Sequence, residues 1–173
     1  AGFPVLPIGR VSGQLPEGIG EVEDIYIFNL LLSMDESDGP PERFARMSLH
    51  QFLTRLTSLD GQHYYYDESS QSSANVETAA AEEETFEATP YVLIIDQFEE
   101  IFRYHRQGSR NEAETFVALL LTSAGQQEIP VPIYVVTTMR SDFIGDCAVF
   151  RGLPEMMNRS QFLVPRLTRE QQR

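Results

Sequence analysis

An α/β fold built on a mostly parallel sheet is the fold class that the sequence predicts. The first observation is the apolar run of residues 91–95, which suits a strand buried on both faces, and such strands belong to parallel sheets covered by helices. The second is another apolar run within residues 129–138. Between the two runs, apolar residues recur at the three- and four-residue spacing of a helix. Strand, helix and strand in this order predict a right-handed βαβ unit.

Three carboxylates follow the first apolar run. Asp96 stands at its carboxyl end, and Glu99 and Glu100 come shortly after it. An apolar strand followed by D-x-x-E-E is the Walker B pattern, in which the Asp holds Mg²⁺ and a Glu polarises the water that attacks a γ-phosphate. Ligands of open α/β sheets bind beyond the carboxyl ends of the strands, which is where these acids are expected. The same residues also fit a helix cap, with Asp96 as N-cap and Glu99 at the third helical position.

Polar residues also end the second apolar run. Thr138 and Arg140 are among them. If the two strands are parallel neighbours, these two residues emerge at the same edge of the sheet as Asp96. Arg140 also has a second interpretation, as a surface partner of Asp142 or Asp146, and a pair of that kind contributes little stability.

The remaining segments predict flanking helices and two short strands. We expect a strand near the sheet edge over Val5–Val11, where prolines are tolerated. Helices are expected over Glu21–Met34 and Glu42–Leu59, from their apolar spacing. Gln161–Val164 predicts a last short strand, and a further helix begins after it with Thr168 as N-cap.

The segment of residues 60–89 differs in composition from the rest. Between Asp67 and Ala88 it contains seven acids and no base. A segment with so few large apolar residues does not bury enough surface to offset its ordering entropy, so we expect a mobile insertion. It is a solvated linker or, alternatively, an acidic loop that binds a partner. The domain then consists of residues 1–59 and 90–173, with this insertion between them.

Composition limits the function classes. A formal net charge of −13 argues against binding to nucleic acid or to an anionic membrane surface. The single cysteine, Cys147, cannot form an internal disulfide, and no apolar run reaches the roughly 18 residues of a membrane span, so we expect a protein of the reducing cytoplasm. The sequence contains no lysine. Because a phosphate-binding P-loop needs one, either the P-loop lies upstream of Ala1 or the protein is not a nucleotidase.

Three stretches in order, IIDQFEE, IYVVTTMRSDF and FLVPRLTREQ, resemble the STAND class of P-loop NTPases. The resemblance is to the bacterial novel STAND NTPase domains, which are often joined to WD40 or other repeats. It covers residues 91–173 well and residues 3–59 more loosely, as the second strand and its helices. It implies a P-loop NTPase-like (ASCE) sheet flanked by helices, which is incomplete because the first strand and the P-loop are missing.

The resemblance also implies roles for the residues at the sheet edge. Asp96 is implied for Mg²⁺, and Glu99 or Glu100 for the hydrolytic water, with Glu100 preferred as the second acid of the motif. Arg140 is implied as a sensor near the γ-phosphate, and Thr138 stands beside it as a nucleotide-binding residue. The implied ligands are Mg²⁺ and ATP, bound by the full-length protein.

The function implied by the resemblance is a signal-transduction switch. Nucleotide binding and slow hydrolysis set whether sensor and effector modules stay closed, with protein partners contacted through neighbouring repeat or effector domains. The chain alone, without a P-loop, is expected to be inactive. The rival hypothesis is a non-catalytic α/β interaction module whose carboxylates are helix caps and whose acidic loop docks a partner. A G-x-x-x-x-G-K-[ST] motif shortly before Ala1 distinguishes the switch from the module.

Overall fold

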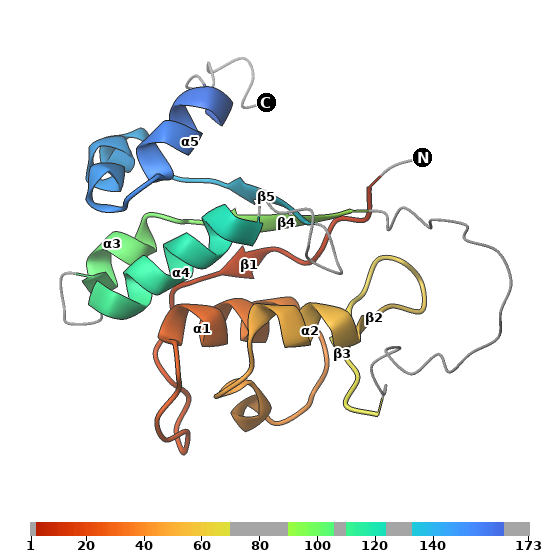
Figure 1. The fold of residues 1–173 in the computed structure, drawn as a ribbon. Helices are drawn as coiled ribbons and strands as arrows, with labels where there is room; N and C mark the ends of the chain where they lie inside the picture. The colour runs from red at the N-terminus through yellow and green to blue at the C-terminus, as the bar shows by residue number, and fades with distance from the viewer. Residues whose placement is uncertain (1–2, 70–89, 106–109, 124–132, 165–173) are drawn as a thin grey trace, which may run out of the picture.

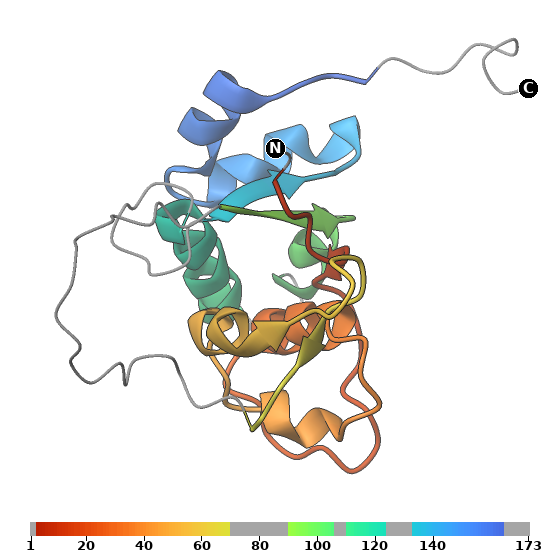
Figure 2. The same cartoon turned by 90° about the vertical axis from the view of Figure 1, so that its right-hand side faces the viewer.

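The central element of the fold is a sheet of three parallel strands. The computed structural model of the protein describes residues 3–69, 90–105, 110–123 and 133–164. Strands β1 (Gly9–Arg10), β4 (Tyr91–Asp96) and β5 (Ile133–Thr137) lie in the order β1–β4–β5 (Figure 1). The view in Figure 2 shows them side by side in this order. This arrangement confirms the predicted α/β class and the parallel pairing of the two apolar runs.

The chain also forms several helices and a small second sheet. In chain order they are α1 (Ile25–Met34), η1 (Pro41–Phe44), α2 (Leu49–Arg55), β2 (Leu56–Thr57), β3 (Tyr65–Tyr66), α3 (Glu100–His105), α4 (Arg110–Ser123), η2 (Ser141–Val149) and α5 (Leu153–Ser160). Strands β2 and β3 pair antiparallel. No helix in the described ranges is both long and apolar enough to cross a bilayer.

The first strand is interrupted by an extra residue. Val5 pairs with Val92, and further on Gly9 pairs with Ile95, so four steps along the first segment face three steps along β4. An extra residue of this kind is a bulge, which ends regular pairing locally. The predicted edge strand over Val5–Val11 is therefore present only as an isolated bridge followed by the two-residue β1.

Helix α1 begins later than its sequence pattern suggests, because Asp24 caps it. The Asp24 carboxylate accepts hydrogen bonds from the backbone N–H groups of Tyr26 (2.9 Å) and Ile27 (3.0 Å). An extended N-cap with two such bonds fixes the first helical residue. The acids before it, including Glu21, lie outside the helix, so the predicted start at Glu21 was wrong.

The carboxyl group of Asp24 is buried, and burial raises its pKa to about 6. The two backbone N–H bonds lower this pKa, whereas the nearby acids Glu112 and Glu23 raise it further. Because the pKa in the folded state lies above the unfolded value, the free energy of unfolding falls as the pH rises from about 4 to about 6. Asp24→Asn keeps an oxygen for the cap and has no charge to desolvate. We expect it to be more stable than wild type by about 1–2 kcal/mol at pH 7.5, and to lose this advantage at pH 4.

Urea unfolding at both pH values measures this difference. Asp38→Asn, at an exposed position, is the matched control and should change neither value by more than about 0.5 kcal/mol. An Asp24→Asn variant that is less stable than wild type at pH 7.5 would show that the charged cap outweighs the cost of its burial.

The predicted helix over Glu42–Leu59 was wrong in its extent. Two prolines begin the short 3₁₀ helix η1, and Ser48 then caps α2 in a reciprocal capping box with Gln51. The capping box sets the start of α2 at Leu49. After Arg55 the chain becomes β2, because its backbone pairs with β3.

Part of the segment expected to be mobile is built into the core. Tyr64 and Tyr66 are buried, and Tyr66 stacks on Phe52 with ring centroids 5.8 Å apart. Both tyrosines therefore pack in the core. Residues 70–89, which include most of the predicted acidic insertion, lie outside the described residues, as does Thr168.

The predicted last strand over Gln161–Val164 is not formed. These residues follow α5 without regular structure, and Phe162 is 85% exposed. A strand exists only where its backbone groups are paired, and among the described residues this segment has no partner strand.

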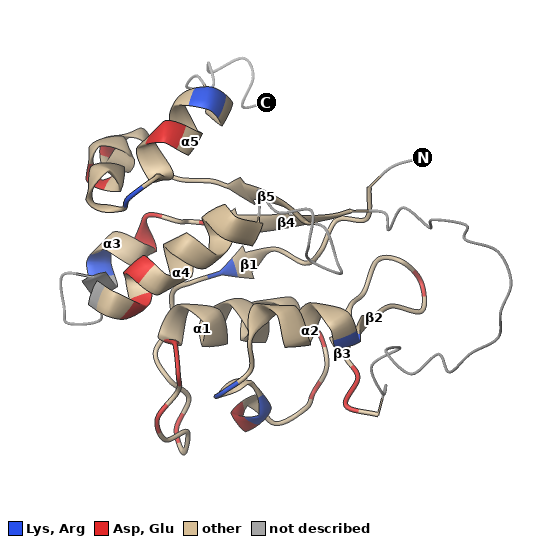
Figure 3. Cartoon of the chain, in the orientation of Figure 1, with Lys and Arg blue, Asp and Glu red and all other residues tan. Residues whose placement is uncertain are grey.

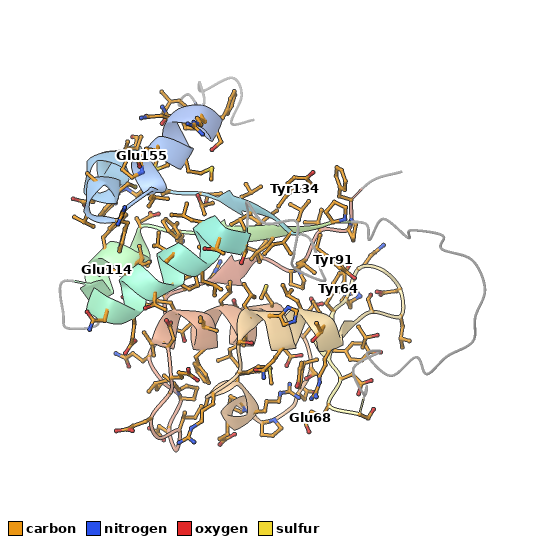
Figure 4. The ribbon with its side chains drawn as sticks, in the orientation of Figure 1. Tyr64, Glu68, Tyr91, Glu114, Tyr134 and Glu155 are labelled. Carbon is orange, nitrogen blue, oxygen red and sulfur yellow. The ribbon has the colours of Figure 1, made fainter. Side chains whose placement is uncertain are left out.

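Within the described part of the chain, the sheet is covered on one face only. Side chains of β4 alternate, with Leu93 and Ile95 fully buried and Val92 and Ile94 partly exposed. On the buried side, α1 and α4 meet through Tyr26 and Phe116, whose ring centroids are 5.8 Å apart. On the other side, which we call the bare face, Val5, Tyr134 and Val136 are about half exposed. Figure 4 shows Tyr134 on the opposite side of the strands from Tyr91.

Candidate functional site

Asp96 is the last residue of β4, the middle strand of the sheet. Its Oδ1 accepts a hydrogen bond from the Thr138 hydroxyl at 2.6 Å, and its Oδ2 lies 4.0 Å from a terminal nitrogen of Arg10. Side chains alternate between the two faces along a strand, so Asp96 points to the same face as Val92 and Ile94. Its carboxylate therefore lies on the side of the bare face. One oxygen is thus held by a hydroxyl while the other has no hydrogen bond among the described residues.

Thr138, directly after β5, fastens the turn that follows β4. Its N–H donates to the Ile95 carbonyl and its carbonyl accepts from the Phe98 N–H, both at 2.9 Å. Its hydroxyl oxygen accepts from the Gln97 N–H at 3.3 Å while donating to Asp96. Backbone and side chain of one residue therefore fix both the strand end and the orientation of its carboxylate.

The turn itself contains a backbone outlier next to Asp96. Gln97 has φ of 56°, in the left-handed region that residues other than glycine seldom adopt. A residue in this region costs of order 1 kcal/mol and persists where surrounding contacts enforce it, which happens most often at functional sites. Here the enforcing contacts come from Thr138.

Asp96 does not cap the following helix. Helix α3 begins only at Glu100, and the Asp96 carboxylate hydrogen-bonds to Thr138 rather than to a backbone N–H of α3. The helix-cap interpretation of D-x-x-E-E is therefore not the one that the fold adopts.

The two glutamates of the motif have different environments. Glu99 is 8% exposed, and its Oε2 has no hydrogen-bond partner among the described residues. Glu100 pairs with Arg103 on the next turn of α3, with both carboxylate oxygens near one guanidinium nitrogen at 3.0 and 3.1 Å. A buried polar atom without a partner requires an explanation, whereas the Glu100 pair is an ordinary surface contact.

Arg140 forms the surface ion pair with Asp142 that was one of its two interpretations from the sequence. Its guanidinium pairs with Asp142 and lies over the Phe143 ring, 5.7 Å from the centroid. It is largely exposed, and the partners of Asp96 among the described residues are Thr138 and Arg10.

Arg10 is the residue at this edge that sequence reasoning missed. It pairs with Asp96 in the β1–β4 register, and Figure 3 shows the blue end of β1 and the red turn after β4 at the same end of the sheet. Its position depends on a register between segments far apart in the chain, which no local pattern reveals. The available signal was an arginine at the end of the first extended segment.

The side chains at this edge suit Mg²⁺ only where a bound nucleotide supplies further ligands. Among the described residues, no three His, Cys, Asp or Glu side chains gather as a metal cage. Mg²⁺ in phosphate-transferring sites needs only one or two carboxylates, with phosphate oxygens and water completing the octahedron, and the free Oδ2 of Asp96 suits that role.

Cys147 does not contribute a nucleophile. It is buried in η2, and burial raises the pKa of its thiol. Cys147 is therefore a small buried apolar residue.

The comparison with known families decides what kind of domain this is. The sequence profile of the family Novel STAND NTPase 1 matches residues 30–173, well over half of the chain. The chain belongs to this family. The matched range of this STAND NTPase domain includes Asp96, Glu99, Glu100, Thr138 and Arg140, whereas β1 lies before it. No curated protein and no solved structure matches the chain.

Proposed function

We propose that this STAND NTPase domain is one half of the nucleotide site of a molecular switch. It supplies the groups that bind Mg²⁺ and face the γ-phosphate, and the complete protein binds Mg-ATP and hydrolyses it slowly. The observation that supports this most is the Asp96 carboxylate, held by Thr138 at the end of the central strand with one oxygen available. Asp96 binds Mg²⁺, a glutamate of the motif orients the attacking water, and Arg140 responds to the γ-phosphate. ATP supplies the transferred phosphoryl group, and Mg²⁺ neutralises its charge.

The phosphate-cradling loop comes from another segment of the polypeptide in this proposal, because no residue here can be its lysine. The bare face supports this idea. Parallel sheets are normally covered on both faces, yet Tyr134 and Val136 are 55% and 47% exposed.

The handedness of crossovers indicates where the additional segment lies. The connections β1→β4 and β4→β5 step in the same direction across the sheet, so right-handed crossovers put their helices on one common face. A connection that enters β1 from a strand beyond β5 steps in the opposite direction, and its helix therefore covers the bare face. In this proposal the first strand and the P-loop therefore lie beside β5, on the side from which the Asp96 carboxylate emerges.

The switch operates in the cytoplasm in this proposal, which agrees with a single buried cysteine. Its protein partners bind through neighbouring repeat or effector domains.

The isolated chain is expected to release no phosphate from Mg-ATP above the buffer rate. Positioning and charge stabilisation of the phosphates supply nearly all of phosphoryl-transfer catalysis, and the P-loop provides much of both. A steady-state phosphate assay measures this directly. Release that is abolished by Glu99→Gln or Glu100→Gln would show that the chain is active by itself.

The proposal as a whole is tested on the longer polypeptide. An upstream G-x-x-x-x-G-K-[ST] motif and calorimetric binding of Mg-ATP are expected. A parent protein that has neither belongs to the rival class of non-catalytic interaction modules.

A further inference from the structure

We propose that Arg10 binds the terminal phosphate of the nucleotide, next to the Mg²⁺ ion that Asp96 holds. This inference rests on the proposed function and adds to it a residue from β1, outside the range matched by the family.

The backbone around Arg10 is fixed by α1. The Arg10 N–H donates to the Ser33 hydroxyl at 2.8 Å. Directly before it, Gly9 lies so close to Leu30 that a β-carbon would clash with the leucine side chain. After it, the Asn29 amide donates to the carbonyls of Val11 (3.4 Å) and Gly13 (3.3 Å). The Arg10 side chain therefore projects from a defined position at the carboxyl edge of the sheet, as a preorganised ligand group requires.

The guanidinium of Arg10 is not used by the fold. It is 59% exposed, and its distance of 4.0 Å from Asp96 Oδ2 is too long for a hydrogen bond. Among the described residues it makes no other ion pair and no side-chain hydrogen bond. Arg43 differs, because its guanidinium is 11% exposed and pairs with Asp35. Arg10 thus has its donors available beside the proposed metal ligand.

A cation stabilises the acidic groups at the carboxyl edge of the sheet. Asp96 ends β4, and Glu99 and Glu100 follow it closely, in a chain with a net charge of −13; a triphosphate is itself strongly negative. Without ligand, Arg10 offsets part of the Asp96 charge. Once Mg²⁺ binds Asp96, the guanidinium and the metal repel each other unless an anion lies between them. A phosphate group resolves this, because it binds Mg²⁺ through one oxygen and accepts parallel N–H donors on others.

The strand order indicates which phosphate this is. The proposed P-loop lies beyond β5, on one side of Asp96, and Arg10 lies on β1, on the other side. A P-loop would hold the nucleotide from the β5 side, so the phosphate closer to β1 would be the terminal one. Arg10 then distinguishes ATP from ADP.

The test uses the longer polypeptide with its P-loop, titrated calorimetrically with Mg-ATP and with Mg-ADP. We expect Arg10→Ala to weaken Mg-ATP binding about 10- to 100-fold and Mg-ADP binding less than about twofold, since a charge-assisted bond is lost only with ATP. Arg10→Lys keeps the positive charge but lacks the planar pair of N–H donors, so its Mg-ATP affinity should lie between those of wild type and Arg10→Ala. Arg159→Ala removes an exposed arginine on α5 and should change neither affinity.

Each other outcome overturns a defined part of the proposal. Equal losses for both nucleotides would mean that Arg10 acts through Asp96 or the fold and not on the terminal phosphate. Unchanged affinities for both nucleotides would show that Arg10 does not bind the nucleotide, and they would leave the proposed function intact. A wild-type protein that binds neither nucleotide overturns both. If Arg10→Ala fails to fold, Arg10→Gln provides the uncharged comparison.

Discussion

Arg43→Met is expected to destabilise the folded chain by about 3–5 kcal/mol. The Arg43 guanidinium pairs with Asp35, whose side chain is 2% exposed, and it also donates to the Ser37 hydroxyl at 2.6 Å. It lies over the rings of Phe44 and Tyr66, at 4.7 and 5.6 Å from the centroids. Methionine fills much of the same volume but leaves the buried Asp35 carboxylate without its cation, which is the costly way to break a buried pair.

Urea unfolding measures this loss. Arg46→Met is the matched control, because Arg46 is an exposed arginine in the same connection, and it should change stability by no more than about 0.5 kcal/mol. The double variant Arg43→Met, Asp35→Asn should recover part of the loss, since no unpaired charge remains. A single Arg43→Met variant within 1 kcal/mol of wild type would mean that solvent reaches Asp35 and replaces its partner.

Local signals predicted the middle of the sheet well. The two apolar runs were correctly identified as the strands β4 and β5, and the strand–helix–strand order predicted their parallel pairing. The predicted burial of the first run on both faces was wrong for the described part of the chain, where Val92 and Ile94 are partly exposed. The meeting of Asp96 and Thr138 follows from that pairing, because both residues stand where adjacent parallel strands end.

Other features depended on competition between neighbouring signals. Asp24 and Glu21 both suit the start of a helix, and Asp24 sets the start because its carboxylate reaches two backbone N–H groups. The apolar spacing of residues 42–59 continues through a segment that the Ser48 cap divides. Periodicity alone does not show such a break.

The remaining features depend on contacts that are distant in the chain. The proximity of Arg10 and Asp96 requires the β1–β4 register, and that register includes a bulge. The difference between Glu99 and Glu100 depends on the direction in which the turn after β4 leaves the strand, which the left-handed Gln97 sets. Consecutive residues of the motif therefore have opposite environments, and sequence spacing alone did not separate their roles.

In the proposed longer polypeptide that carries a P-loop, Asp96→Ala is expected to weaken Mg-ATP binding by about 100-fold or more, equivalent to about 2.7 kcal/mol. Asp96 is the proposed protein ligand of Mg²⁺, and Thr138 holds its second oxygen in place. Thr137→Val, one residue away in β5, keeps the strand and leaves the Thr138 hydroxyl in place, so it serves as the control. Calorimetric titration measures both variants. Unchanged Mg-ATP affinity in Asp96→Ala would contradict the Walker B assignment.

The same polypeptide separates the two glutamates. We expect Glu99→Gln to bind Mg-ATP normally and to slow single-turnover hydrolysis by about 10²–10⁴-fold, the usual contribution of a positioned acid or base. Glu99 is the stronger candidate because its buried Oε2 has no partner in the described part of the chain, whereas Glu100 is held by Arg103. Glu100→Gln is the matched control and should slow hydrolysis less than about fivefold. The reverse pattern would assign the attacking water to Glu100, the second acid of the motif, and would require its pair with Arg103 to open when nucleotide binds.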